Sequence, residues 1–219
     1  MKLIILNGIE VLIEESEKYI QINDIQEKDL PVVWETLRKN FPGYELVLCF
    51  RDMAVSEDAL ASIGAEVLED CLTMKTIPDG FMPYKCDEVA PLEKADFAAF
   101  AALHDRYNPD CGGTSRHIWE KWGDWPVFLL RQDGEIIGYA LILINLRDAA
   151  MGEIFCVWAR NLENRKALVS AATMCAFING KNEVIYMVDR DNVDEYDGAA
   201  AVGFKEAGFY IGYRVESIN

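Results

Sequence analysis

The stretch from Gly152 to Ile178 constrains the fold more than any other part of this sequence. It begins GEIFCVWA, whose β-branched and aromatic side chains predict a buried strand. A polar corner follows at residues 160–166, and then ALVSAATMCAFI, which is typical of a well-buried helix with Asn161 as its N-cap. Unpaired N–H groups at such a corner point outward. The corner can therefore hold an anion such as a pyrophosphate, or it can be an ordinary strand-to-helix turn.

The composition limits the class of protein. The chain has 219 residues, is 51% hydrophobic and carries a formal net charge of −16. It can form one large domain or two small ones. Nucleic acid is not an expected partner, because phosphate binding needs a basic face. An acidic surface favours a cationic substrate, or it serves only solubility.

Cysteines and the N-terminal residues bear on the compartment. None of the six cysteines forms a C-x-x-C pair, and this pattern is typical of a reduced, cytoplasmic protein. The apolar run at the N-terminus is interrupted by Asn7, Gly8 and Glu10, so it is too short for a signal peptide or a membrane span. His104 and His117 are the only histidines, too few for a histidine-rich metal site.

Residues 1–82 predict strands at 2–6, 9–13, 19–25, 45–50 and 67–75, and helices at about 24–41 and 56–63. Asp24 and Glu27 have the spacing of a capping box for the longer helix. Pro78, Asp79 and Gly80 form a break, near which we place a domain boundary.

The second part predicts a strand at 84–89, helices at 95–107 and 115–122, and a flexible loop at 108–113. A hairpin of strands at 127–131 and 136–145 turns at Asp133 and Gly134. After the central strand and helix come a strand at 183–188, a helix at 192–202 and a strand at 204–216. Residues 1–82 repeat the element order of the last half of this part.

Residues 84–217 resemble the GNAT superfamily of acyl-CoA N-acyltransferases. The resemblance is carried by GEIIGYAL from Gly134, EIFCVW from Glu153, and Asn192 followed by an Ala-rich helix and GFKE from Gly203. It implies an α/β fold, a GNAT-like mixed sheet with splayed central strands, over residues 83–219. Residues 1–82 resemble a truncated GNAT-like half-domain of order β-β-α-β-α-β.

The resemblance implies an acyl-CoA-dependent N-acyltransferase that transfers an acetyl or other acyl group to a small amine. The amine attacks the thioester directly, and acetyl-CoA or another acyl-CoA is the co-substrate. The alternative is a degenerate, non-catalytic binding or scaffold protein of the same fold. Neither nucleic acid nor a membrane is expected as a partner, and the location is expected to be cytoplasmic. Residues 1–82 are expected to pack on the second domain or to pair with another chain, so a homodimer stays open.

The resemblance also implies roles for single residues. Backbone groups at Val157, Trp158 and Ala159 would bind the pantetheine arm, and Asn192 would touch it unless it only caps a helix. The side chains of Arg160, Arg165 and Lys166 would hold the pyrophosphate, because the corner lacks the family's glycines. Glu153 would be the base, unless it is only a charge at a strand entrance.

Members of the family often use a tyrosine as the general acid, and the resemblance puts Ala199 at that position. Tyr196, nearly one helical turn earlier, is then the nearest substitute for the general acid. Trp119, Trp122 and Trp125 are core residues or the wall of an acceptor pocket. His104 and His117 are structural, or they line the acceptor site.

Overall fold

A computed structural model describes residues 2–108, 114–144 and 150–218. The chain divides into two compact units: unit 1 is Met1–Leu72 with Gly208–Asn219, and unit 2 is Thr73–Ala207. These units differ from the predicted domains, 1–82 and 83–219, chiefly because the C-terminal residues belong to unit 1. The domain limits themselves stay a prediction. Part of the predicted loop at 108–113 lies outside the described residues.

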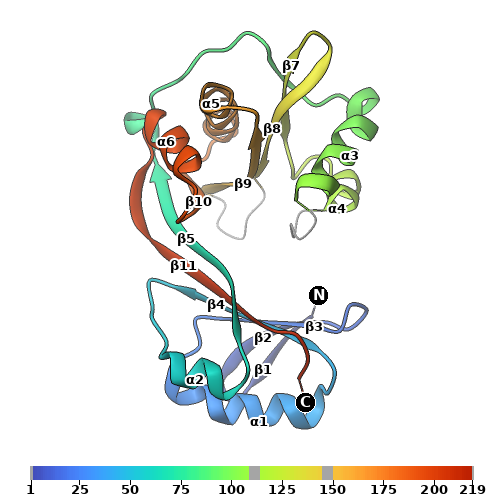
Figure 1. The fold of residues 1–219 in the computed structure, drawn as a ribbon, viewed down its shortest axis with the longest axis vertical. Helices are drawn as coiled ribbons and strands as arrows, with labels where there is room; N and C mark the ends of the chain where they lie inside the picture. The colour runs from blue at the N-terminus through green and yellow to red at the C-terminus, as the bar shows by residue number, and fades with distance from the viewer. Residues whose placement is uncertain (1, 109–113, 145–149, 219) are drawn as a thin grey trace. The chain divides into compact units, whose positions relative to one another are not determined.

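Unit 1 is one sheet with helices on one face (Figure 1). Its sheet order is β1-β2-β3-β4-β11-β5, in which β3 and β4 are parallel and the pairs β1/β2, β2/β3 and β4/β11 are antiparallel. The elements are β1 (Lys2–Leu6), β2 (Ile9–Glu14), β3 (Tyr19–Asn23), η1 (Glu27–Asp29), α1 (Leu30–Asn40), β4 (Glu45–Arg51), α2 (Glu57–Ser62), β5 (Glu66–Thr76) and β11 (Lys205–Val215). Residues 66–72 of β5 and 208–215 of β11 belong to this unit.

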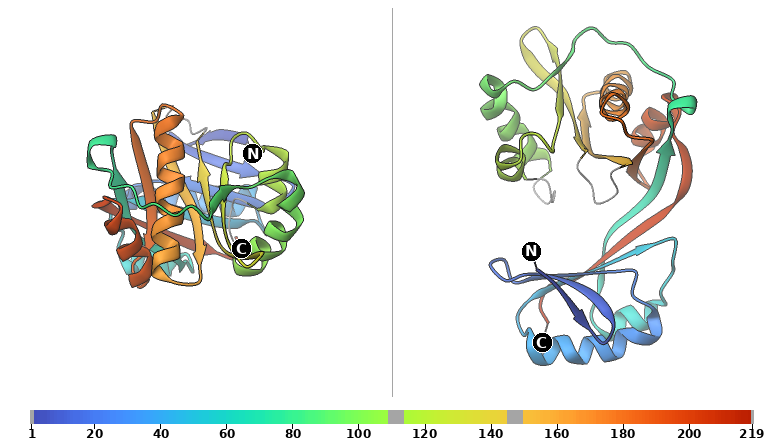
Figure 2. Two further views of the ribbon diagram at one scale, coloured as in Figure 1. Left: turned by 90° about the horizontal axis from the view of Figure 1, so that it is seen from above. Right: turned by 180° about the vertical axis from the view of Figure 1, so that it is seen from behind.

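The core of unit 1 lies between its sheet and the two helices (Figure 2). Alternate residues of the strands, such as Val11 and Leu46, are buried against Leu37 of α1. Val215 and Ile218 belong to the same core, although they come from the end of the chain. Unit 1 is therefore incomplete without the C-terminal segment.

The predicted capping box at Asp24 and Glu27 is wrong. Asp24 has a positive φ of 53°, and its Oδ1 accepts the backbone N–H of Arg51 at 2.9 Å. Glu27 instead accepts the backbone N–H and the hydroxyl of Ser56, at 3.0 and 2.8 Å. Both side chains have long-range donors that a local sequence pattern cannot reveal, so α1 begins only at Leu30.

Unit 2 is a sheet with helices on both faces: α5 and α6 cover one face, and α3 and α4 cover the other (Figure 1). Its order is β6-β7-β8-β9-β10-β5-β11, in which residues 73–76 of β5 and 205–207 of β11 belong to this unit. The elements are η2 (Pro78–Gly80), β6 (Val89–Pro91), η3 (Lys94–Asp96), α3 (Phe97–Tyr107), α4 (Ser115–Glu120), β7 (Val127–Gln132), β8 (Glu135–Leu143), β9 (Met151–Ala159), α5 (Leu162–Ile178), β10 (Glu183–Asp189) and α6 (Val193–Ala201).

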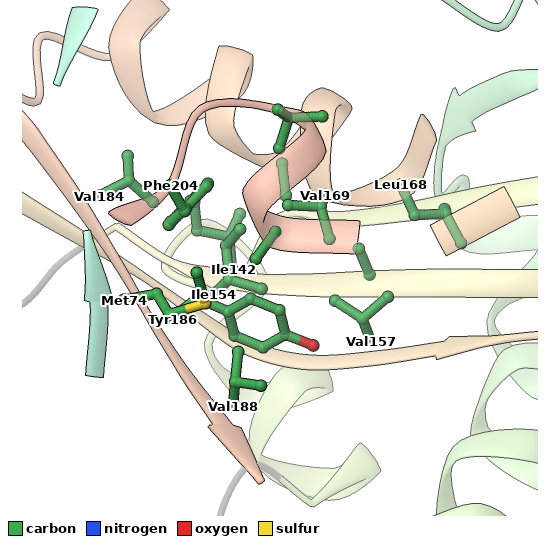
Figure 3. Packing of buried hydrophobic residues seen from close by; sticks show 14 of the residues in the cluster. Met74, Ile142, Ile154, Val157, Leu168, Val169, Val184, Tyr186, Val188 and Phe204 are labelled. Atoms are coloured by element: carbon green, nitrogen blue, oxygen red, sulfur yellow. The ribbon is translucent and has the colours of Figure 1, made fainter. Parts of the chain in front are cut away.

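The sheet of unit 2 has two separate cores. Met74, Ile154, Leu168 and Tyr186 belong to the core beneath α5 and α6 (Figure 3). Leu129, Tyr139 and Phe100 of α3 belong to the core on the other face. Because both faces are covered, β8 is buried along most of its length. The predicted mixed α/β architecture is thus confirmed.

Two local predictions in unit 2 have opposite outcomes. The predicted strand at 84–89 is wrong, since β6 covers only Val89–Pro91. The backbone N–H of Tyr84 instead donates to Ser170 Oγ of α5 at 2.9 Å, so this segment bonds to a helix and not to a strand. The hairpin is confirmed: Asp133 and Gly134 both have positive φ, as a tight two-residue turn requires.

Among the described residues, no helix is both long and apolar enough to cross a membrane.

Candidate active site

The site begins with a β-bulge in β9. Leu141 of β8 lies opposite Cys156, but the next residue, Ile142, lies opposite Ile154, which leaves Phe155 as an extra residue on β9. Phe155 and Cys156 both pack on the α3/α4 side of the sheet, whereas Ile154 and Val157 pack on the α5/α6 side. A bulge of this kind bends its strand and often lies next to an active site.

Beyond the bulge β9 and β10 part. Their parallel pairing runs from Met151 opposite Glu183 to Ile154 opposite Tyr186. The described register ends there, although β9 continues to Ala159 and β10 to Asp189. The predicted splay of the central strands is therefore confirmed. The carboxyl ends of parallel strands are also where ligands usually bind in α/β sheets.

Arg165 of α5 reaches into this gap. Its Nη1 donates to the carbonyl oxygen of Val157 at 3.0 Å and to Glu195 Oε1 of α6 at 3.0 Å. The side chains of Arg165 and Glu195 are only 11% and 15% exposed. Glu195 Oε2 also accepts the backbone N–H of Asp189, at 3.3 Å. One ion pair thus joins β9, the end of β10 and the first turns of two helices.

Gly198 makes room for this arrangement. A Cβ added at Gly198 would lie 2.9 Å from Cδ and 3.0 Å from Cγ of Arg165. Any larger residue at this position of α6 would have to displace the arginine stem. The path of Arg165 into the gap therefore depends on a glycine from a different helix.

Tyr186 of β10 places a polar group in the same region. Its side chain is 2% exposed, and its hydroxyl is directed toward Val157 (Figure 3). The hydroxyl makes no hydrogen bond of normal geometry to the described residues, but it lies close enough to Arg165 and Glu195 to interact with both side chains. Burial, and then the charge of Glu195, raise the pKa of Tyr186 well above its usual value, while Arg165 opposes the rise. The tyrosine is therefore protonated at neutral pH.

The polar corner after β9 is closed by the protein's own groups. Asn161 is confirmed as the N-cap of α5, because its Oδ1 accepts the N–H of Asn164 at 2.9 Å. Each basic side chain predicted to bind pyrophosphate has an acidic partner: Arg160 with Glu135 at 3.1 Å, Arg165 with Glu195 at 3.0 Å and Lys166 with Glu163 at 2.7 Å. The corner therefore presents less uncompensated positive charge than its sequence suggests.

The two predicted catalytic residues lie apart. Glu153 is half-buried on β9, and it lies on the α3/α4 side because it alternates with Ile154. Tyr196 of α6 packs on the opposite side of the sheet. Its hydroxyl donates to Glu206 Oε1 at 2.9 Å, and this bond raises the pKa of Tyr196. Their catalytic roles stay predictions.

The other predicted cofactor contacts have structural partners. Asn192 caps α6, since its Oδ1 accepts the N–H of Glu195 at 3.2 Å. The Trp158 ring stacks on Tyr107 with a centroid distance of 4.6 Å. Ala159 pairs with Gly138 of β8. These contacts fix the backbone along which a pantetheine arm is predicted to lie.

The aromatic and imidazole side chains of α3, α4 and the segment after α4 differ in their burial. His104 is fully buried, and its Nδ1 lies 3.1 Å from the Tyr139 hydroxyl, so its role in the described structure is structural. Trp122 and Trp125 pack against the core on this side. Trp119 is 49% exposed and lies 4.8 Å from the Phe97 ring, between centroids. His117 lies on an exposed part of α4.

Sequence reasoning missed three residues of this site: Tyr186, Glu195 and Gly198. In the sequence Glu195 looks like an acidic residue in the first turn of a helix, where such residues are common. Its partner Arg165 lies 30 residues earlier in the sequence. No local spacing indicates this pairing.

Comparisons with known proteins identify the fold. No family model matches the sequence, and no curated protein matches it. Among solved structures, a GCN5-related N-acetyltransferase from Kribbella flavida aligns with a TM-score of 0.69 and 15% identity, covering 97% of this chain and 88% of that one. A GCN5-related N-acetyltransferase from Sphaerobacter thermophilus gives 0.63 and 16%, covering 96% and 76%.

A tandem GNAT protein from the clavulanic acid biosynthesis pathway gives a TM-score of 0.61 and 12% identity, covering 96% of this chain and 78% of that one. The chain therefore has the fold of GNAT acetyltransferases. At such identities the similarity establishes the fold alone. The interpretation of residues 1–82 as a copied half-domain stays a prediction.

Proposed function

We propose that this protein is an acyl-CoA-dependent N-acyltransferase with a small amine as acceptor. The observation that carries the proposal is the gap between β9 and β10, which opens at the Phe155 bulge. The fold neighbours support it, because several are acetyltransferases by name. In this proposal the thioester lies in the gap, along the backbone from Val157 to Ala159.

The chemistry needs an uncharged amine beside the thioester. Glu153, on the α3/α4 side of β9, removes the proton of the ammonium group, directly or through one water. The amine nitrogen then forms a bond with the acyl carbon, the carbon–sulfur bond breaks, and CoA leaves as a thiolate. Tyr196 is the predicted proton donor to that thiolate, and the acylated nitrogen loses its extra proton to solvent, which gives the neutral amide and the CoA thiol. Most of the rate enhancement comes from holding the two reactants together.

The test is release of free CoA thiol from acetyl-CoA in the presence of a panel of diamines, amino acids and aromatic amines. We expect turnover with at least one amine. Glu153→Gln should lower the rate by about 10²–10⁴-fold, with little change in acetyl-CoA affinity. Glu120→Gln on the exposed face of α4 is the matched control and should leave turnover unchanged. Absence of thiol release with every amine would contradict the proposal.

A second candidate, a non-catalytic relative, is favoured by the closed corner. Asn161 caps the helix, and the three predicted pyrophosphate cations are paired with carboxylates. A protein of this kind would bind no acetyl-CoA, or would bind it without turnover. Calorimetry with acetyl-CoA, run beside the thiol assay, separates the two candidates.

A further inference from the structure

We propose that Arg165 and Glu195 form an internal plug, which occupies the acyl-CoA gap and has to leave before the pantetheine arm can enter. This inference rests on the proposed function, since it assumes that the gap is the acyl-CoA site. It concerns how the site is controlled.

Arg165 and a bound pantetheine arm would compete for the Val157 carbonyl. This oxygen accepts Arg165 Nη1 at 3.0 Å, at the point where β9 has left β10. An amide N–H of a pantetheine arm bound along β9 is the same kind of donor. The guanidinium therefore stands where that donor would stand, and the two cannot bond the carbonyl in the same geometry.

The hydroxyl of Tyr186 is poorly satisfied while the plug is in place. It is buried and directed toward Val157, and it interacts with Arg165 and Glu195 without a hydrogen bond of normal geometry to the described residues (Figure 3). A buried polar group in that state costs free energy, which a ligand that bonds to it would recover. Removal of the plug would open this hydroxyl to whatever enters the gap.

The plug can move without breaking the sheet. Arg165 and Glu195 both lie near the start of a helix, α5 and α6 respectively. Rotation of the two side chains would take them out of the gap while β9 and β10 kept their pairing up to Ile154. In the absence of a ligand the ion pair stays in place, because the departure of one side chain alone would leave the charge of the other unpaired at low exposure.

The plug should lower the apparent affinity for acetyl-CoA in proportion to the fraction of molecules in which the gap is open. If it were in place in about 99% of molecules, the apparent dissociation constant would be about 100-fold higher than that of the open state. Removal of both partners should recover part of this factor.

The experiment is calorimetric titration with acetyl-CoA of three proteins: the unaltered chain, Arg165→Ala with Glu195→Ala, and Arg116→Ala with Glu120→Ala. The last is a matched control, because it removes an ion pair of the same charges from the exposed surface of α4. We expect the plug variant to bind at least about tenfold more tightly, and the control to bind as the unaltered chain does.

A second variant guards against misfolding. Arg165→Leu with Glu195→Gln keeps most of the buried volume but removes the charges and the donor to Val157, so it should also bind more tightly. In the unaltered protein, acetyl-CoA should shift the side-chain N–H resonances of Arg165 and speed their exchange with solvent. If acetyl-CoA binds the unaltered protein and the Arg165 resonances do not change, the plug proposal is contradicted.

The outcomes separate this inference from the proposed function. Turnover with equal affinity in all proteins overturns the plug and leaves the transferase standing. Tighter binding by both plug variants without turnover supports the plug and contradicts the transferase. No binding by any protein overturns both.

Discussion

The parallel pair β3/β4 of unit 1 and the parallel pair β9/β10 of unit 2 are each joined through a helix, and they end in opposite ways. In unit 1, β3 and β4 stay paired from Tyr19 opposite Glu45 to Asn23 opposite Cys49. The backbone then continues the contact, because Asp24 N–H donates to the Cys49 carbonyl at 2.7 Å. In unit 2, β9 and β10 part after Ile154. Beyond that point the Val157 carbonyl of β9 accepts a hydrogen bond from buried Arg165 instead of from β10.

The difference shows what makes a gap in such a sheet. The register of β3 with β4 continues to the end of β3, whereas the bulge at Phe155 bends β9 and removes its carbonyls from the reach of β10. The freed Val157 carbonyl then needs a donor, and Arg165 supplies it. Polar chemistry is therefore expected at the open pair of unit 2 and not at the closed pair of unit 1.

The largest expected effect comes from separating unit 1 from the strand that completes it. A fragment of residues 1–82 lacks β11, which pairs with β4 from Leu46 to Arg51, and it lacks the core residues Val215 and Ile218. A domain of this size buries too little surface to tolerate the loss. We expect the fragment alone to show no slowly exchanging amides in β4.

The matched control for this fragment is the same 1–82 segment joined to residues 205–219 by a glycine-serine linker. It should regain amide protection, because the missing strand is restored. Full protection of β4 in the isolated, monomeric fragment would show that unit 1 folds without the C-terminal strand.

The next effect compares a buried ion pair with an exposed one. Arg165→Ala leaves the carboxylate of Glu195 unpaired at 15% exposure, and it should lower the free energy of unfolding by about 3–5 kcal/mol. Arg51→Ala breaks the exposed pair with Asp24 at the closed end of β3 and β4, and it should cost about 0–1 kcal/mol. Urea unfolding of both variants measures the difference. Equal losses would mean that the gap is filled by solvent rather than by a buried ion pair.

Much of the fold could be predicted from the sequence, because its signals are local. The turn at Asp133 and the N-cap at Asn161 follow from residue types that suit those conformations. The capping box at Asp24 failed for the opposite reason, since the donor to its carboxylate comes from Arg51 on another strand. The direction of Arg165 could not be predicted, because it depends on Gly198 and Glu195 of a distant helix.

A smaller effect distinguishes two glutamates that pair with neighbouring cations of α5. Burial raises the pKa of Glu195 above its ordinary value of 4.5 despite the opposing charge of Arg165. Hydrogen bonds from Lys166, and then from Tyr84, lower the pKa of exposed Glu163 below the same value. The stability linked to Glu195 is therefore present below pH 4.5 and lost as the pH rises through its folded pKa. That linked to Glu163 is present above pH 4.5 and lost as the pH falls through its folded pKa.

Carboxyl-resolved NMR titration of the folded protein measures both groups together. We expect Glu195 to titrate at a higher pH than Glu163, and Arg165→Leu to raise the pKa of Glu195 further because the opposing charge is lost. The reverse order would mean that Glu195 is solvated and that the gap is open in the resting protein.

The central claim is that the parted strands of unit 2, and not the paired strands of unit 1, form the acyl-CoA site. Backbone amide spectra recorded during titration with acetyl-CoA test it most directly, because every strand is observed in one experiment. The account predicts saturable shifts at Val157, Ala159 and Arg165, with none at Gln21 or Cys49. Shifts confined to β3 and β4, or no shift at any concentration of acetyl-CoA, would contradict it.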